Sequence, residues 1–362
     1  MPETPYFVID EEKMVNNIHR MSEIANANYV ALRPHVKTHK IPEIAKRQLA
    51  AGAAGITVAK VSEAEVMRAQ GIDDIFIAYP LVVESKIERA IALAKDITLT
   101  LGVDSLTGAR KLSEVAARHG ETLHVRLEVD TGLQRTGIRY EDAMSLAVEI
   151  DSLEAIELTG IYTYRGSLVD GAPSLDRARA GHQEGTLMAN LAERIRECGI
   201  ALKDVSVGST PTAEYVAQVP GVTEIRPGTY VFSDRMQAAF GVGSLADCAG
   251  RVVTTVVSRP SEDLVIVDGG SKTFATDVQP GVPPLYLRGF GVVCDYPEAV
   301  FERMTEEHGM IRIPPEAGIA VGDRLEIIPN HICSTVNLHN YAYLSRSNAL
   351  ERMAISARGK LD

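Results

Sequence analysis

The densest cluster of basic side chains follows a short apolar segment near the N-terminus. It reads Arg33-Pro34-His35-Val36-Lys37-Thr38-His39-Lys40. In an extended segment, side chains two positions apart point to the same face, so His35, Lys37 and His39 would lie together. A lysine amine crowded by positive charge and held by apolar side chains loses its proton more easily. Lys37 is therefore a candidate Schiff-base nucleophile, although a charged run is more often a solvated surface.

A second cluster combines a glycine with several hydroxyl groups. It reads Gly208-Ser209-Thr210-Pro211-Thr212 and precedes a predicted helix start. Backbone N–H groups, hydroxyl donors and a helix N-terminus together bind phosphate. The other interpretation is an ordinary helix cap, since Ser and Thr are favoured there.

A third cluster is the segment from Pro329 to Cys333, in which His331 and Cys333 are two positions apart. In an extended segment both side chains point the same way. Imidazole and thiolate are ligands that suit Zn²⁺, and two ligands leave positions open for water or substrate. The other three cysteines are spread along the chain without a CxxC pair, and we expect them to be buried thiols: Cys198, Cys248 and Cys294.

The elements that position these clusters alternate between short apolar runs and amphipathic stretches. The runs are 29–32, 55–59, 75–78, 97–101, 123–129, 156–164, 205–208 and 223–226. Helical patterns lie between them, among others at 84–95, 105–119, 140–151 and 175–199. Eight such units predict a (β/α)₈ TIM-type barrel over 11–244, with catalysis at the C-terminal ends of the strands. A doubly wound open sheet is the alternative, but no GxGxxG follows the first strand.

The character of the sequence changes near residue 245. Short strand-like runs, separated by Gly, Pro and Asp turns, lie at 251–258, 264–267, 289–294, 310–313, 324–329 and 353–357. We therefore expect a C-terminal antiparallel β domain over 245–362 that carries His331 and Cys333. The N-terminal strand Tyr6–Asp10 can pair with it, so 1–10 is assigned to the same domain.

Composition excludes several classes of protein. The chain has 362 residues with 37 basic and 48 acidic side chains, so 37 − 48 gives a net charge of −11. This balance argues against nucleic acid or an anionic membrane surface as the main partner. No stretch approaches the roughly 20 apolar residues of a membrane span, and the N-terminus lacks signal-peptide blocks. We expect a cytoplasmic enzyme.

Taken together, a Schiff-base lysine, a phosphate loop and a barrel suggest pyridoxal phosphate (PLP). The sequence resembles the D-threonine aldolase and D-serine dehydratase family, which has the alanine-racemase-type barrel. The likeness runs from Thr4-Pro5 to Arg358-Gly359. It is carried by the lysine cluster, the Gly208–Thr212 loop, the segment Val267-Asp268-Gly269-Gly270-Ser271-Lys272, and His331-x-Cys333 followed by Thr335-Val336-Asn337-Leu338-His339.

This resemblance implies roles for particular residues. Lys37 would carry the cofactor and act as the base at the substrate Cα. Arg135 would lie near the ring hydroxyl of PLP and Tyr164 would contact its ring. The phosphate would be bound by Gly208, Ser209, Thr210, Gly228 and Thr229. His331 and Cys333 would bind a divalent metal, Zn²⁺ first and Mn²⁺ or Mg²⁺ as alternatives, which holds the substrate β-hydroxyl.

The resemblance implies a PLP- and metal-dependent lyase for D-β-hydroxy amino acids. We expect D-threonine aldolase-like cleavage to glycine and an aldehyde, because Tyr164–Ser167 is similar to the aldolases. Dehydration of the D-serine dehydratase type is the alternative, because Cys333 is typical of the dehydratases, whereas aldolases carry Asp. A histidine that follows the tyrosine motif in aldolases is replaced here by Val169 or Asp170.

Two further alternatives remain from the residues alone. One is an amino-acid racemase, which needs a second base for which the sequence offers no candidate. The other is a non-catalytic PLP-binding protein, which would not need a metal pair or a β domain. The expected partners are a small D-amino acid and a second copy of the chain in a homodimer, with no nucleic acid and no membrane.

Overall fold

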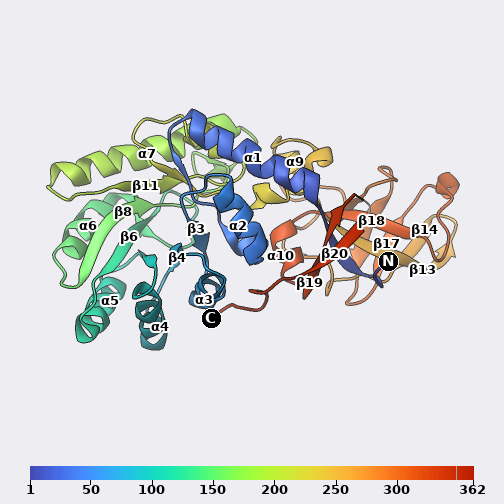
Figure 1. Cartoon of the computed structure of the whole chain (residues 1–362). Coiled ribbons are helices and arrows are strands. Elements are labelled where there is room, and N and C mark those ends of the chain that lie inside the picture. Colours follow the sequence, from blue (N-terminus) through green and yellow to red (C-terminus); the bar gives the residue numbers. More distant parts are fainter. Residues whose placement is uncertain (348) are drawn as a thin grey trace. The chain divides into compact units, whose positions relative to one another are not determined.

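The structure is a computed structural model that describes residues 1–347 and 349–362 (Figure 1). The chain divides into two compact units, which we describe separately. The barrel unit comprises Arg20–Lys37, Pro42–Gly228 and Lys360–Asp362. The β unit comprises Met1–His19, Thr38–Ile41 and Thr229–Gly359, so the division falls inside helix α1 (Glu11–Ala27). The domain limits expected from the sequence, 11–244 and 1–10 with 245–362, stay a prediction.

Eight parallel strands form the main sheet of the barrel unit, in the order β2-β12-β11-β8-β6-β5-β4-β3. Their bounds are β2 (Ala31–Leu32), β3 (Ile56–Val58), β4 (Asp74–Pro80), β5 (Thr98–Val103), β6 (Leu123–Asp130), β8 (Ile156–Tyr162), β11 (Asp204–Val207) and β12 (Glu224–Ile225). The short β7 (Ile138–Arg139) pairs with β6. Each of the eight overlaps one predicted apolar run, because strands covered on both faces must be apolar throughout. The predicted alternating α/β fold is confirmed.

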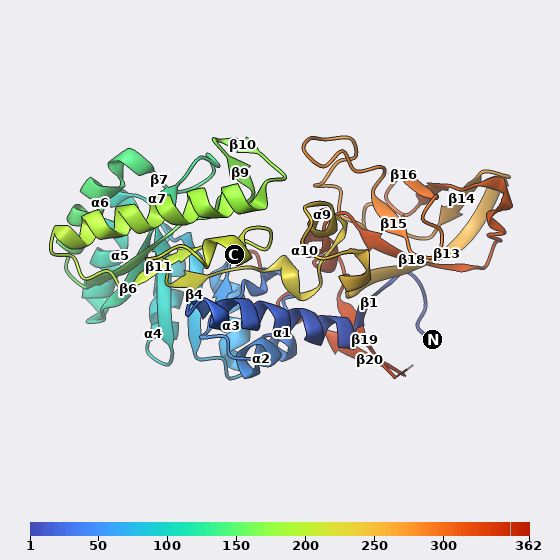
Figure 2. The same cartoon turned by 90° about the horizontal axis from the view of Figure 1, so that it is seen from above.

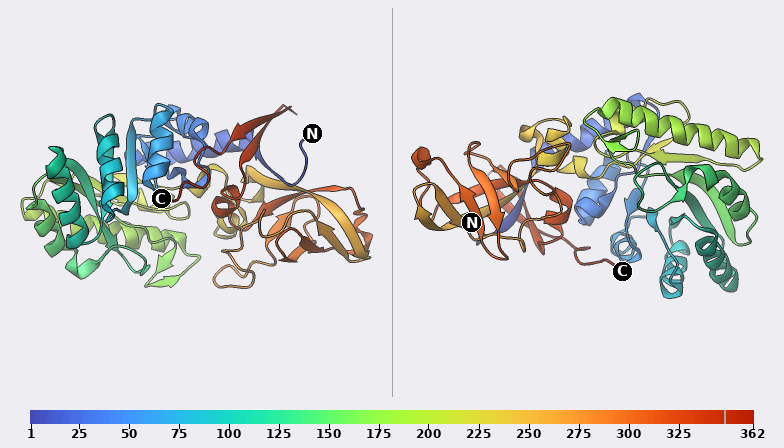
Figure 3. Two further views of the ribbon diagram at one scale, coloured as in Figure 1. Left: turned by 90° about the horizontal axis from the view of Figure 1, so that it is seen from below. Right: turned by 180° about the vertical axis from the view of Figure 1, so that it is seen from behind.

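Helices cover the outside of this curled sheet (Figures 2 and 3). They are α2 (Pro42–Ala50), α3 (Val61–Ala69), α4 (Glu84–Ala94), α5 (Leu106–His119), α6 (Ala143–Asp151), α7 (Arg177–Glu197) and α8 (Ala213–Val216). Helix α5 shows the local causes: Ser105 caps its start by accepting a hydrogen bond from Gly108 N at 3.2 Å. Gly120, with φ of 67°, ends it. Among the described residues, no helix is long and apolar enough to cross a membrane.

The two ends of the strand order meet at one bridge. His35, just after β2, forms a parallel bridge with Thr57 in β3. Thr57 N donates to Pro34 O at 2.8 Å, and Ala54 N donates to Leu32 O at 2.9 Å. These bonds join the edge strands of the curled sheet, and they bring the chain to Lys37 directly after the bridge.

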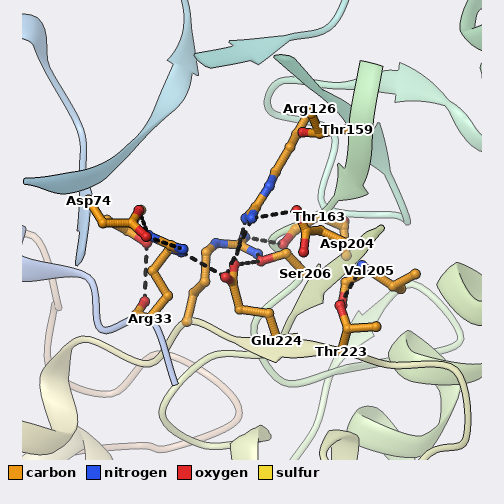
Figure 4. A network of polar contacts seen from close by, with 12 residues as sticks. Arg33, Asp74, Arg126, Thr159, Thr163, Asp204, Val205, Ser206, Thr223 and Glu224 are labelled. Atoms are coloured by element: carbon orange, nitrogen blue, oxygen red, sulfur yellow. Dashed lines mark hydrogen bonds and ion pairs between the residues drawn. The ribbon is translucent and has the colours of Figure 1, made fainter. Parts of the chain in front are cut away.

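The interior of the barrel unit contains a buried network of charges instead of a purely apolar core (Figure 4). Glu224 accepts hydrogen bonds from Arg33 Nε at 2.7 Å and Arg126 Nη1 at 2.6 Å. The two arginines also pair with Asp74 and Asp204. Burial raises the pKa of Glu224, but Arg126 and Arg33 outweigh burial and lower it to about 2. Loss of one partner would leave a buried unpaired charge, at a cost of about 3–5 kcal/mol.

All three carboxylates of this network are the first residues of their strands, β4, β11 and β12. They therefore lie at the amino ends of the strands. In barrels of this kind the amino ends contribute to stability, whereas the carboxyl ends carry the chemistry. The network is part of the scaffold, and the candidate site must be sought where the strands end.

The β unit contains a sheet in the order β16-β17-β14-β13-β1-β19-β20, with β18 paired to β13 and β15. Its strands are β1 (Tyr6–Asp10), β13 (Gly250–Ser261), β14 (Leu264–Val267), β15 (Gly291–Val293), β16 (Val300–Met304), β17 (Gly309–Arg312), β18 (Arg324–Pro329), β19 (Tyr341–Arg346) and β20 (Ala349–Ala354). The N-terminal strand β1 pairs antiparallel with β13 and parallel with β19. The predicted β domain that includes the N-terminal strand is confirmed.

Three strand assignments in this unit differ from the sequence analysis. Strands β16 and β19 were not predicted. The run expected at 353–357 overlaps β20 only at its first two residues, because β20 begins at Ala349 and ends at Ala354. In β20 no residue is buried, so its position leaves no apolar signal in the sequence. Its place is set by pairing with β19, which a sequence pattern cannot show.

Candidate functional site

The segment that carries Lys37 is a turn and not the extended segment assumed from the sequence. Val36–Thr38 forms a 3-10 turn directly after the bridge between His35 and Thr57. The expected shared face of His35, Lys37 and His39 is therefore wrong, because the turn breaks the period of two. The position of Lys37 after strand β2 agrees with the prediction.

The positive charge near Lys37 comes from arginines and not from histidine. Burial lowers the pKa of His35 well below its ordinary value, and the charges of Lys37, Arg226 and Arg135 lower it further. The imidazole is therefore neutral at pH 7. Arg226 follows β12 and is buried, and it donates to Ser206 Oγ and to a backbone oxygen, both at 2.6 Å.

Three predicted residues meet at one aromatic ring in the barrel unit. The Tyr164 ring lies 5.6 Å from Lys37 Nζ and 4.7 Å from Arg135 Cζ, measured to the ring centroid. These residues follow three different strands, β8, β2 and β6. They come together because the carboxyl ends of parallel strands lie at one end of the sheet. A cation over an aromatic face is attracted by the ring quadrupole.

Glu128, near the end of β6, holds the segment that presents Arg135. Its carboxylate accepts hydrogen bonds from Thr136 Oγ1 at 2.8 Å and Tyr162 OH at 3.0 Å. Arg135 Nη2 lies 3.9 Å from the same carboxylate. Burial raises the pKa of Glu128, against these hydrogen bonds and the Arg135 charge. The sequence placed Glu128 at a strand end but gave it no role.

The Gly208–Thr212 loop follows β11 as predicted, but it uses part of its own hydrogen-bonding capacity. Ser209 N donates to Thr212 Oγ1 at 3.1 Å, and the two hydroxyls are also 3.1 Å apart. The helix that follows, α8, is a single turn, so its dipole contributes little. A Cβ on Gly208 would lie 2.7 Å from Val216, and its φ of 82° also requires glycine.

Glu184 is a buried carboxylate that was not predicted, and it holds this loop by hydrogen bonds. Glu184, in α7, accepts from Gly208 N at 3.2 Å and from Thr212 Oγ1 at 3.3 Å. Burial raises the pKa of Glu184 to about 7, against these hydrogen bonds and nearby arginines. The Gly208 N–H and the Thr212 hydroxyl therefore both bond to a carboxylate in the protein interior. Phosphate binding by Gly208, Ser209 and Thr210 stays a prediction.

The remaining two predicted phosphate ligands are split between the units. Gly228 is the last residue of the long barrel-unit segment, and Thr229 begins a 3-10 turn (Thr229–Val231) of the β unit. The Thr229 hydroxyl lies 3.3 Å from Cys333 Sγ. Phosphate binding by either residue stays a prediction.

His331 and Cys333 lie together in the β unit. His331 is the residue before the short helix α10 (Ile332–Val336), and Cys333 is in its first turn. The assumption of a wholly extended segment is therefore wrong, yet the imidazole and the thiol are hydrogen-bonded to each other. Burial opposes charge on both, but their mutual attraction raises the pKa of His331 and lowers that of Cys333.

Several residues distant in sequence hold this pair. Thr38 Oγ1 lies 3.1 Å from Cys333 Sγ, so this hydroxyl and that of Thr229 can donate to a thiolate. Buried Asp234 accepts from Ile332 N at 2.9 Å and fixes the start of α10. None of these contacts has a sequence signal, since Thr38 is separated from Cys333 by 295 positions.

The donor set can be compared with what a metal ion requires. Within residues 1–347 and 349–362, no three His, Cys, Asp or Glu side chains form a group that could hold a metal ion. The pair of His331 and Cys333 supplies two donors, an imidazole nitrogen and a thiolate, which suit Zn²⁺. Other coordination positions would then be filled by water or substrate, as in a catalytic site.

Two family models and several curated relatives match this chain. The family model for the alanine racemase N-terminal domain matches residues 9–236, and that for a putative serine dehydratase domain matches residues 249–345. A D-threonine aldolase from Arthrobacter sp is 34% identical, over 99% of this chain and 93% of the relative. A D-threo-3-hydroxyaspartate dehydratase from Delftia sp. is 35% identical, over 92% of this chain and 91% of the relative.

Solved structures agree with these matches. The D-threonine aldolase from Filomicrobium marinum has a TM-score of 0.88 at 27% identity, covering 99% of this chain and 97% of that one. The Delftia dehydratase has a TM-score of 0.88 at 31% identity, covering 98% and 97%. One structure of that dehydratase is a cysteine-to-alanine mutant in the metal-free form. This chain therefore belongs to the alanine-racemase-type family of D-threonine aldolases and D-serine dehydratases, and it is a PLP-dependent lyase.

Proposed function

We propose that this protein is a PLP- and divalent-metal-dependent lyase that cleaves D-β-hydroxy amino acids of the D-threonine type into glycine and an aldehyde. The observation that carries the proposal is the meeting of Lys37, Arg135 and Tyr164 at the ends of three barrel strands. The D-threonine aldolase from Arthrobacter sp, to which this chain is similar over nearly its whole length, supports the choice of reaction. The match to the serine dehydratase domain favours a lyase over a racemase or a non-catalytic carrier.

The barrel unit fits PLP in both charge and chemistry. When bound, PLP serves as an electron sink for the substrate Cα. Lys37 supplies the amine that attaches the cofactor and can hold a proton at the substrate Cα. Arg135 and Tyr164 would orient the ring, and the hydroxyls of Ser209 and Thr210 would donate to the phosphate.

The β unit fits a divalent ion. His331 and Cys333 would hold it, and it would act as a Lewis acid toward the substrate β-hydroxyl. The hydroxyls of Thr38 and Thr229 lie 3.1 Å and 3.3 Å from the Cys333 sulfur, and both would stabilise a thiolate by donating hydrogen bonds to it. This ligand chemistry favours Zn²⁺ over Mn²⁺ or Mg²⁺.

Dehydration to a 2-oxo acid and ammonia is the second candidate. The environment of Asp170 supports dehydration. Asp170 is one of the two residues that can stand in place of the aldolase histidine. It is paired with Arg179, and it accepts a hydrogen bond from Gln183 Nε2 at 2.8 Å. A carboxylate held in this way is poorly placed to take a proton from a β-hydroxyl. The thiolate ligand and the Delftia dehydratase also support this candidate.

Product analysis distinguishes the two. Holoenzyme with Zn²⁺ would be incubated with D-threonine, D-serine and D-threo-3-hydroxyaspartate. Glycine with an aldehyde supports aldol cleavage, and ammonia with a 2-oxo acid supports dehydration. No turnover of any of the three would contradict both.

We also propose that the chain acts as a homodimer, as the family resemblance implies. Light scattering after size exclusion should then give about twice the chain mass of 39.2 kDa. A mass of one chain would contradict this.

A further inference from the structure

Asp277 is a loop residue of the β unit to which neither the sequence nor the proposed function gives a role. Its Oδ2 lies 2.6 Å from His331 Nδ1. Ser334 Oγ donates to the same oxygen at 3.0 Å. The Asp277 side chain is therefore held against one specific nitrogen of the imidazole.

This contact determines which nitrogen of His331 remains for other partners. A neutral imidazole has one N–H donor and one acceptor, and the hydrogen bond of one nitrogen sets the role of the other. With Nδ1–H donating to Asp277, Nε2 is the nitrogen that can offer a lone pair to a metal ion once its own proton has left. The backbone at this point is also fixed, because Asp234 accepts from Ile332 N at 2.9 Å.

We propose that Asp277 is a positioning residue that fixes the ring of His331, so that Nε2 and the Cys333 sulfur together bind one divalent cation. The inference rests on the metal pair of the proposed function and adds the residue that orients it. A carboxylate on the second nitrogen of a histidine ligand raises the basicity of that ligand and fixes its rotation. The other role for Asp277 is a purely structural one, in which it ties its loop to helix α10.

Cobalt binding to the metal-stripped, PLP-loaded enzyme tests the proposal. Co²⁺ bound to a thiolate gives a charge-transfer absorption, which reports ligation by Cys333 independently of activity. Asp277→Ala should weaken Co²⁺ binding about ten- to a hundredfold. Asp277→Asn keeps an acceptor oxygen but loses the charge, so its loss should be smaller. ¹⁵N NMR of the zinc-loaded protein should show a proton on His331 Nδ1 in the wild type.

A matched control is Asp263→Ala, which removes another aspartate of the β unit, one that pairs with Arg312 at 2.8 Å. This variant should bind Co²⁺ within twofold of the wild type. If Asp277→Ala also binds Co²⁺ within twofold of the wild type, the positioning role is overturned. Where the alanine variant does not fold, the same result in Asp277→Asn overturns it. If His331→Ala and Cys333→Ala leave Co²⁺ binding unchanged, the metal pair itself is wrong and the inference falls with it.

Discussion

The two units carry opposite charge around their predicted sites. In the barrel unit the ring of Tyr164 has Lys37 and Arg135 beside it, and with Arg226 they lower the pKa of His35. In the β unit the imidazole of His331 lies between the Cys333 sulfur and a carboxylate. The first arrangement suits an anionic cofactor such as PLP, and the second suits a metal cation. Each unit can therefore be tested with its own kind of ligand, an anionic cofactor for the barrel unit and a metal cation for the β unit.

The largest effect is expected from removing the amine of the barrel site. Lys37→Ala should lower turnover by at least about a thousandfold, because attachment of the cofactor and proton transfer at Cα both need that amine. The rate of product formation measures it. The control Lys272→Ala removes an exposed lysine paired with Glu307 and should keep wild-type turnover. Near-normal turnover in Lys37→Ala would contradict the catalytic role of Lys37.

The next largest effect concerns the β unit alone. A chelator, or His331→Ala, should lower turnover about a hundredfold while the absorbance of bound PLP stays the same. Zn²⁺ should restore the chelated enzyme best, and Cys333→Asp should shift the preference toward Mn²⁺, because a carboxylate is a harder ligand. Activity and elemental analysis are measured together. Full activity without stoichiometric metal would contradict the role of this unit.

A smaller effect is expected at the phosphate loop. Thr210→Val removes one hydrogen bond to a charged group, worth about 1.5–3 kcal/mol. The dissociation constant of PLP should rise about ten- to a hundredfold. Thr254→Val, which removes a buried hydroxyl of the β unit, is the control and should bind PLP normally. An unchanged constant in Thr210→Val would exclude a phosphate contact by this hydroxyl.

The sequence predicted the barrel site better than the surroundings of the metal pair. Strand ends are visible as breaks in apolar runs, and parallel strands bring these ends together. Lys37 could therefore be singled out from its position in the sequence, and the family resemblance added Arg135 and Tyr164. His331 and Cys333 were visible as a local pair, but Asp277 lies 54 positions from His331 and no pattern connects them. Contacts made only by tertiary folding leave no periodic signal.

The turn at Lys37 shows the same limit within the barrel unit. The residues indicated an extended segment, but the bridge from His35 to Thr57 ends the pairing there. Likewise, the Gly208–Thr212 loop was predicted, whereas Glu184 beneath it was hidden in the helical pattern of α7. In both segments, hydrogen bonds between residues distant in the sequence determine the local structure.

The smallest effect is a change of stability with pH. Burial raises the pKa of folded Glu184 to about 7, above its ordinary 4.5. Between these values the folded state binds more protons than the unfolded state, so this group makes the protein less stable as pH rises, by up to about 3 kcal/mol. We therefore compare the melting temperature of Glu184→Gln with that of the wild type at two pH values. The difference should favour the variant by a few degrees more at pH 8 than at pH 5.

Glu214→Gln, an exposed change in α8, controls for net charge and should show the same difference from the wild type at both pH values. If Glu184→Gln also shows no pH dependence relative to the wild type, the buried carboxylate does not titrate in this range.

The central claim, that Lys37 of the barrel unit carries the cofactor, is tested most directly by borohydride reduction of the PLP-loaded enzyme. Reduction fixes PLP to its lysine, and mass spectrometry of the digest then identifies the labelled peptide. We expect a single labelled peptide with the modification on Lys37. A label on Lys40, Lys60 or Lys272, or no label on any lysine, would contradict it.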